Sequence, residues 1–166
     1  MKRVLVGLML LLLLTGCGRD ETYTVPGLTQ RLQDNDPGMR YTAAKTLGSY
    51  GVEAKPAVPQ LTQALKDTDP SVRVGAAYAL AAIGPDAESA LSALTDALKD
   101  PDAELRVAAA YAIPAVGPAA QTALPTLQQL AQRDRERRVR EGATQAIRKL
   151  EAAAKYRPSP ALSAQK

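Results

Sequence analysis

The sequence predicts an all-α fold, an α-solenoid of about four stacked helix pairs, on the strength of three observations. First, the stretch from Leu61 to Gly84 recurs 33 residues later at Leu94 to Gly117 and, less closely, at Leu28 to Gly51. Second, apolar residues in both halves of each unit follow helical spacing. Third, Asp-Pro and Gly-Pro pairs separate these apolar stretches. A unit of this size cannot bury its apolar face alone, so neighbouring units must share a continuous core.

The first helix of each unit is expected to be short and to pack through leucines. Leucines four residues apart lie on one helix face. Pro26, Pro59 and Pro125 fall near the starts of these helices, where a missing amide hydrogen costs little. The leucine pairs are Leu28/Leu32, Leu61/Leu65 and Leu94/Leu98.

In each of the first three units, a turn joins the first helix to the second. These turns contain Asp36, Asp69 and Asp102. An aspartate at this position accepts hydrogen bonds from the free amides of the first helical turn, and a following proline presets φ. We therefore expect these carboxylates to be helix caps rather than members of a catalytic pair or a cation site. The apolar positions of the second helices are Met39, Ala43, Thr46, Leu47 and Tyr50, then Val72, Ala76, Ala79, Leu80 and Ile83, then Leu105, Ala109, Ala112, Ile113 and Val116.

Glycines follow the second helices at Gly51, Gly84 and Gly117. Glycine after the last helical residue is typical of a left-handed cap, and we expect that conformation at all three positions. Pro85 and Pro118 come next and are expected to prevent the helices from continuing.

The fourth unit departs from the pattern. Its turn, Arg133 to Arg138, lacks Asp-Pro and holds one extra residue, so its second helix aligns at a spacing of 34. Charged residues near its end are what a capping repeat requires. The solenoid is therefore expected over residues 25–155, and the Pro- and Ser-containing tail 156–166 is expected to be disordered.

The motif Asp-Pro-x-Val-Arg at Asp69 to Arg73, the pair Ala76-Ala77, and Leu80 with Gly84 resemble the HEAT-repeat family. The resemblance covers Val25 to about Ala154 and is to the short-unit form that also occurs in proteins related to phycobilin lyases. It implies a scaffold on which many different partners bind. No residue here matches a catalytic residue of those lyase relatives.

The amino terminus predicts a cleavable signal segment. Lys2 and Arg3 precede an apolar run from Val4 to Leu14, the arrangement of a secretory signal. Eleven apolar residues span only about 16 Å as a helix, whereas the hydrocarbon core of a membrane is about 30 Å thick. We therefore favour a signal peptide over a transmembrane anchor.

Leu14 to Cys17 resembles the lipobox of bacterial lipoproteins, in which the cysteine is acylated and the signal is cut just before it. The resemblance implies a signal peptide at 1–16, a lipidation site at Cys17 and a spacer over 17–24. Gly18, in place of the Asp that often retains such proteins in the inner membrane, favours the periplasmic side of the outer membrane. The alternative is an ordinary signal peptide with an incidental cysteine.

The composition excludes most enzymatic chemistry. The chain has no His, which removes the commonest general base and metal ligand. Its single cysteine is Cys17, so no disulfide can form within the chain. We expect no catalytic activity, no metal and no cofactor.

Arginines occupy equivalent positions in successive repeats and form what we call the arginine column. Its members are Arg40, Arg73, Arg106 and, at the longer spacing, Arg140. Two interpretations are open. Each guanidinium can bridge to an aspartate of a neighbouring turn and form a structural ladder. Alternatively, a row of guanidinium groups near helix N-termini can bind phosphate or carboxylate.

A second column is aromatic. Tyr78 and Tyr111 occupy equivalent positions away from the core stripe, and Tyr41, Val74 and Val107 form the adjacent column. In the architecture that the resemblance implies, second helices line the concave surface, so these five residues can form an exposed ridge. Exposed aromatic residues on a rigid scaffold are common anchors of an interface. The alternative is that they pack on the next repeat.

Charge is unevenly distributed. Residues 25–125 hold eight basic and eleven acidic side chains, whereas residues 133–157 hold nine basic and four acidic. The basic end suits an acidic partner, anionic lipid or solvent. Export and the lack of an interleaved aromatic platform argue against nucleic acid.

The sequence thus predicts a lipid-anchored, non-catalytic scaffold for unidentified envelope proteins, with the membrane contacted through Cys17. The alternative is an accessory protein that holds a small ligand or prosthetic group in the concave groove, as in the phycobilin-lyase relatives.

Overall fold

The computed structural model describes residues 23–155, and these residues are helical throughout apart from short turns. None of the described residues lies in a strand. The helices alternate with 3-10 segments, which are designated η. The elements are α2 (Val25–Arg31), α3 (Pro37–Tyr50), η2 (Gly51–Ala57), α4 (Val58–Ala64), α5 (Pro70–Ile83), η3 (Gly84–Ala90), α6 (Leu91–Ala97), α7 (Ala103–Ala112), η4 (Ile113–Ala115), η5 (Pro118–Ala123), α8 (Leu124–Arg133) and α9 (Arg137–Lys155).

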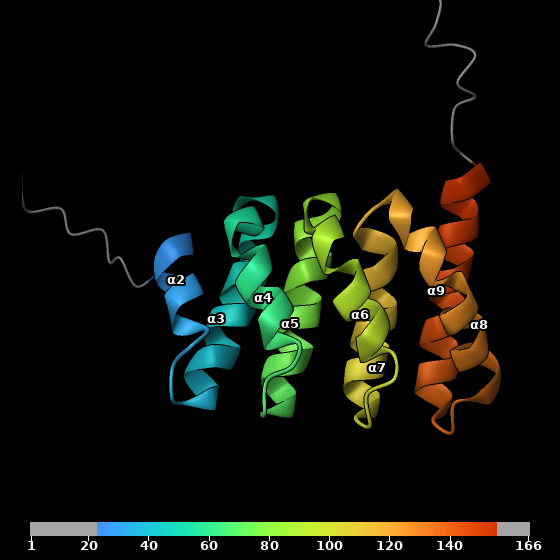
Figure 1. The fold of residues 1–166 in the computed structure, drawn as a ribbon, viewed down its shortest axis with the longest axis horizontal. Coiled ribbons are helices and arrows are strands. Elements are labelled where there is room, and N and C mark those ends of the chain that lie inside the picture. Colours follow the sequence, from blue (N-terminus) through green and yellow to red (C-terminus); the bar gives the residue numbers. More distant parts are fainter. Residues whose placement is uncertain (1–22, 156–166) are drawn as a thin grey trace, which may run out of the picture.

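The helix pairs follow one another along the long axis of the molecule, so α2 and α9 lie at opposite ends (Figure 1). The second helices pack in sequence, α3 on α5, α5 on α7, and α7 on α9. The turns inside the pairs lie along the lower edge in Figure 1 and the 3-10 segments along the upper edge. This arrangement is the predicted α-solenoid of about four helix pairs.

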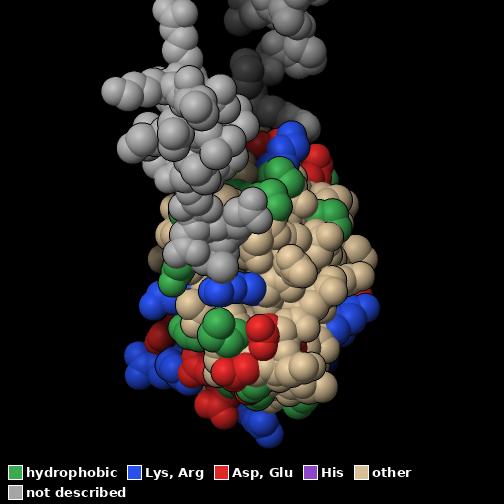
Figure 2. All heavy atoms as spheres, turned by 90° about the vertical axis from the view of Figure 1, so that its left-hand side faces the viewer, with side chains coloured by type: hydrophobic (Ala, Val, Ile, Leu, Met, Phe, Trp, Pro, Cys, Tyr) green, Lys and Arg blue, Asp and Glu red, His purple; other side chains and the backbone are tan. Residues whose placement is uncertain are grey.

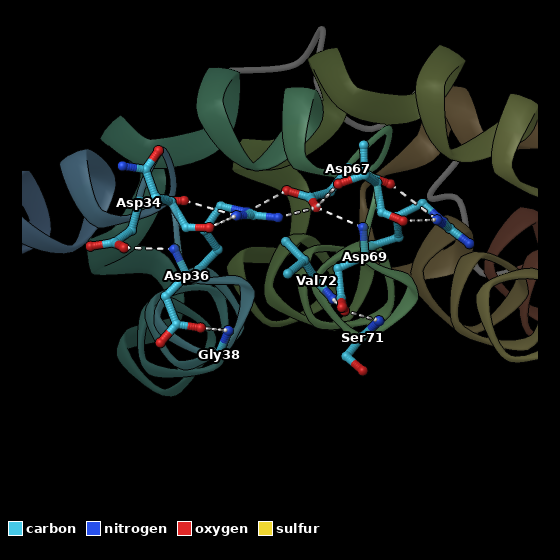
Figure 3. Close-up of polar contacts among 11 residues, drawn as sticks. Asp34, Asp36, Gly38, Asp67, Asp69, Ser71 and Val72 are labelled. Carbon is cyan, nitrogen blue, oxygen red and sulfur yellow. Dashed lines mark hydrogen bonds and ion pairs between the residues drawn. The ribbon is translucent and has the colours of Figure 1, made fainter.

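The aspartate caps form as the sequence predicts. The carboxylates of Asp36, Asp69 and Asp102 each accept a hydrogen bond from the amide two residues further on, at 2.9, 2.8 and 3.0 Å. Figure 3 shows two of these caps, from Asp36 and from Asp69. Because a free amide at a helix start must find a partner, each cap fixes where a second helix begins.

One apolar core runs through all the pairs, from Leu28 to Leu150. The leucine rows of the first helices are buried, and so are the predicted stripes of α5 and of the third unit. Small residues let neighbouring second helices approach closely. For example, a Cβ added to Gly48 of α3 would lie 3.2 Å from the Cα of Ala79 in α5. The alanine-rich composition therefore reflects tight stacking of thin layers.

The first unit is less buried than its sequence stripe predicts. Met39, Thr46 and Tyr50 are only half-buried, because α3 has a second-helix neighbour on one side alone. The hydroxyl of Tyr50 instead donates to the backbone carbonyl of Tyr23, at 2.5 Å. Figure 2 views this end of the solenoid, where acidic and basic side chains lie side by side near the turn edge.

The glycines after α3 and α5 have the positive φ expected of a left-handed cap, but their ψ differs from the expected value. Gly51 and Gly84 have φ of 56° and 76° but ψ of −128° and −140°, far from the left-handed helical region near ψ +47°. The combination of positive φ with strongly negative ψ that these two residues adopt is essentially restricted to glycine. This conformation turns the chain directly into the next 3-10 segment, and Pro85 lies in the first turn of η3.

The third unit ends its second helix early. α7 stops at Ala112 because Pro114 lacks the amide hydrogen that a further helical turn needs. A short 3-10 segment, η4, completes the turn, and Gly117 follows it with φ of 118°. The predicted cap at Gly117 therefore does not end an α-helix.

The predicted signal peptide at 1–16, the lipidation site Cys17, most of the spacer and the tail 156–166 lie outside the described residues. Within residues 23–155, no helix combines the length and the apolar character needed to cross a membrane.

Candidate functional site

The aromatic column lies on one face of the second helices. We call Tyr41 of α3, Val74 and Tyr78 of α5, and Val107 and Tyr111 of α7 the tyrosine face. The tyrosines are 38%, 46% and 52% exposed, in chain order, and they are among the large hydrophobic side chains most accessible to solvent in the described residues. Val74 and Val107 are half-buried between them. The face thus carries exposed aromatic rings on a partly buried aliphatic base.

The tyrosines also touch one another, so the two interpretations of the column are not exclusive. The rings of Tyr78 and Tyr111 have centroids 5.7 Å apart and are tilted by 56°, a favourable aromatic geometry. Tyr41 lies over Gly75, where an added Cβ would come within 3.2 Å of the ring. These contacts hold the rings in place while about half of their surface remains open.

A groove of about 650 Å³ opens between α3 and α5 and reaches the start of α7. Tyr41, Val74 and Tyr78 line it together with Pro37 and Pro70. Its acidic members, which we call the acidic rim, are Asp69, Asp102 and Glu104. The groove therefore combines aromatic and proline surface with negative charge, and none of its lining residues in the described part of the chain is basic.

A second, smaller cavity of about 100 Å³ continues the tyrosine face towards α9. Tyr78 lines both cavities, and Val107 and Tyr111 line the second. The ammonium nitrogen of Lys149 from α9 lies 5.0 Å from the ring centroid of Tyr111, within the range of a cation–π contact. The last repeat thus covers one end of the tyrosine face with a cation.

The arginine column forms an inter-repeat ladder. Arg40 donates from Nε and Nη2 to the carboxylate of Asp67 in the next turn, at 2.8 and 2.7 Å. Its Nη1 donates to the backbone carbonyl of Asp34 in its own turn, at 2.8 Å. Figure 3 shows this connection between the turn of Asp34 and that of Asp67. The guanidinium therefore ties two repeats together.

Arg106 repeats the arrangement at the last interface. It donates from Nε and Nη2 to Asp134, at 2.8 and 3.0 Å, and only 6% of the residue is exposed. Arg106 and Asp134 are 28 residues apart, whereas Arg40 and Asp67 are 27 apart, so the pair forms in spite of the extra residue in the fourth turn. Its Nη1 donates to the backbone carbonyls of Asp100 and Pro101, at 2.8 and 3.0 Å, so the groups that could bind an external anion are already occupied.

The other two members of the column differ. The Nη2 atom of Arg73 lies 3.6 Å from Asp100 and 3.8 Å from Asp102, and its buried Nε has no hydrogen-bond partner. Arg140 donates to the carbonyls of its own turn, and no carboxylate of the described residues forms an ion pair with it. The ladder is therefore strong at its first and third interfaces and looser between them.

Two carboxylates of the ladder, those of Asp67 and Asp134, have a lowered pKa. Hydrogen bonds from Arg40 hold the pKa of Asp67 below its usual value, against the opposing effect of burial. For Asp134, burial raises the pKa, but hydrogen bonds from Arg106 and from the amide of Glu136 outweigh it, so the pKa is lowered overall. In both cases the charged carboxylate is the form that the fold stabilises.

Acidification should therefore destabilise the solenoid. Because the folded pKa of Asp67 lies below its unfolded value of about 3.8, the stabilisation is fully present above about pH 4 and is lost as the pH falls towards the folded pKa. Urea denaturation between pH 7 and pH 3 should show this loss. In Asp67→Asn, the free energy of unfolding should depend less on pH below about pH 4. An unchanged pH dependence in that variant would contradict a role for the pair of Arg40 and Asp67.

The sequence did not predict several of the contacts that the structure shows. The acidic rim combines two cap residues with Glu104, and Glu104 forms an ion pair with Arg138 of α9. Lys55 and Asp86 bridge successive 3-10 segments at 2.7 Å. The only sequence signal for either pair is a separation close to one repeat length. In the part of the chain that the structure describes, no three potential metal ligands cluster.

Comparisons with known proteins agree with this architecture. The model of the HEAT repeats family matches residues 25–113 and 58–148. The chain is also similar to a protein in the complex of CpcE and CpcF of phycocyanin lyase from Nostoc sp. PCC7120, with 28% identity and a TM-score of 0.64 over 79% of this chain and 55% of that one. A search of curated proteins gave no match.

Two engineered proteins have the same fold. One is described only as an engineered protein and shares 24% identity, with a TM-score of 0.62 over 77% of this chain and 62% of that one. The other is a designed armadillo repeat protein, with 21% identity and a TM-score of 0.58 over 79% and 71%. The chain spans less than two thirds of the length of the first two structures that it matches. Because the family model covers most of the solenoid, the chain belongs to the HEAT-repeat family.

Proposed function

We propose that this protein is a membrane-anchored bacterial lipoprotein whose HEAT-repeat solenoid acts as a non-catalytic scaffold for protein–protein interaction in the cell envelope. The observation that carries the proposal is the tyrosine face. Three partly exposed tyrosines lie on the second helices α3, α5 and α7, and two of them, Tyr41 and Tyr78, line a groove of about 650 Å³. Such residues are typical anchors of protein interfaces because they bury much area at a small entropic cost.

The rigidity of the scaffold supports this role. The second helices α3, α5 and α7 are each capped at their start and packed on their neighbours, and hydrogen-bonded arginine–aspartate pairs tie the first and third interfaces. The tyrosine rings are therefore held in place before a partner arrives, which lowers the ordering cost of association.

The anchor is proposed from the sequence alone. Acylation of Cys17 would place two or three chains in the bilayer, each contributing about 0.8 kcal/mol per buried methylene. The spacer to the first helix is short, with a reach of about 25 Å at most, so the solenoid would stay near the membrane. The outer membrane, on its periplasmic side, is the favoured location because Gly18 follows the cysteine.

A pull-down from detergent-solubilised membranes tests anchor and scaffold together. The native chain should fractionate with membranes and retain specific envelope proteins, whereas Cys17→Ser should move to the soluble fraction without loss of helical circular dichroism. Continued membrane association of the variant would contradict the lipid anchor. A native sample that retains no protein would contradict the scaffold.

A second candidate is an accessory protein that binds a small ligand or prosthetic group in the groove. It is favoured by the 28% identity to a component of the phycocyanin lyase complex. The groove volume is within the range of small-molecule sites. A visible absorbance band in protein purified from its natural source would support this function, and a featureless spectrum above 300 nm would count against a pigment.

A further inference from the structure

The last repeat shows how the tyrosine face engages a cation. Lys149 of α9 lies 5.0 Å from the ring centroid of Tyr111. At the 34-residue spacing, the position equivalent to Lys149 in the preceding repeat is Ala115, whose side chain is too short to reach a ring. The cationic cover is therefore a feature of the capping repeat, and Tyr78 receives none from the repeat that follows it.

Tyr41 and Tyr78 are the tyrosines that line the larger groove. Among the described residues, the cation–π contacts are those of Arg31 with Tyr23 and of Lys149 with Tyr111. Tyr41 and Tyr78 thus present aromatic surface to the groove without a cation from residues 23–155. Their exposed fractions, 38% and 46%, leave room for one.

The acidic rim adds negative charge beside these rings. The cap of Asp69 uses its Oδ1 atom, and its Oδ2 atom makes no hydrogen bond within residues 23–155. The cap of Asp102 also uses Oδ1, and its Oδ2 lies 3.8 Å from Arg73. Glu104 is half-exposed and paired with Arg138. Two of these carboxylates already have an arginine nearby, whereas Asp69 forms no ion pair within residues 23–155. Because no described basic residue lines the groove, the carboxylate of Asp69 favours a cation there.

We propose that the larger groove binds an extended, cationic segment of a partner protein, with Lys or Arg side chains over Tyr41 and Tyr78 and close to the acidic rim. Proline or small apolar residues between the cations suit the floor, because aromatic-lined grooves bind proline-rich segments that are already extended before binding. The inference rests on the proposed function, since it assigns a partner chemistry to the same face.

The test uses the full-length chain in a non-ionic detergent and two fluorescein-labelled decapeptides, one alternating Arg and Pro and the other alternating Glu and Pro. Fluorescence anisotropy should give at least tenfold tighter binding of the Arg peptide in 50 mM salt. The preference should shrink severalfold in 500 mM salt because the charges are partly screened. Equal affinity for the two peptides, or no binding of either, would overturn the proposal.

Variants locate the contact. Tyr41→Leu/Tyr78→Leu keeps apolar bulk but removes two aromatic faces, and should weaken binding of the Arg peptide about fivefold to twentyfold. Tyr23→Leu, which removes an exposed tyrosine outside the groove, is the matched control and should leave the affinity unchanged. Equal effects of the two variants would overturn the assignment to the groove. If the peptides fail while membrane pull-downs still depend on the tyrosine face, the scaffold stands and its partner is not cationic.

Discussion

Replacement of Arg106 with methionine should lower the free energy of unfolding by about 3–5 kcal/mol, the usual cost of leaving a buried charge without its partner. Arg106 is 6% exposed and makes two hydrogen bonds to the carboxylate of Asp134. Methionine fills the space of the aliphatic stem, so the loss comes from the ion pair and from the turn carbonyls that the guanidinium also binds. Urea denaturation followed by circular dichroism measures the change.

Two variants separate the charge from the packing. Arg140→Met, at the equivalent position in the last repeat, removes a guanidinium that forms no ion pair with the described carboxylates, and should cost about 1 kcal/mol. Arg106→Met/Asp134→Asn should recover part of the loss, because the uncompensated charge disappears. If Arg140→Met were as damaging as Arg106→Met, the importance of the Asp134 pair would be refuted.

The second large effect is expected in the core. Leu80→Ala should destabilise the protein by about 2–5 kcal/mol, since the leucine is fully buried in α5 and its truncation leaves a cavity between adjacent repeats. Val52→Ala is the matched surface control, because Val52 is 64% exposed, and it should change stability by less than about 0.5 kcal/mol. Thermal or urea unfolding of both variants makes the comparison. A loss below 1 kcal/mol for Leu80→Ala would mean that the repeats relax into the space.

Much of the fold follows from local sequence signals. The repeat length, the leucine rows and the aspartate caps each depend on residues a few positions apart, so they can be inferred without knowledge of the tertiary structure. The 3-10 segments could not be inferred in this way. Their path is set by how one repeat must meet the next, and the glycines at 51 and 84 adopt the ψ values that this path requires.

The candidate site was predictable in position but not in detail. The spacing of Tyr78 and Tyr111 places them on one face, and the structure agrees with that placement. The contact of Lys149 with Tyr111 depends on the register between the last two repeats, which shifts by one residue at the fourth turn. The acidic rim likewise depends on how α7 begins beside α5, and helix periodicity says nothing about that junction.

The most direct test of the central claim, that the tyrosine face binds partners rather than merely packing, is to truncate Tyr78 and Tyr111 together to alanine. Capture of envelope proteins should fall at least tenfold, while the melting temperature should drop by only about 4 °C, the effect of losing one aromatic contact worth about 1 kcal/mol. A melting temperature lowered by 15 °C or more, or full capture by the variant, would contradict the claim.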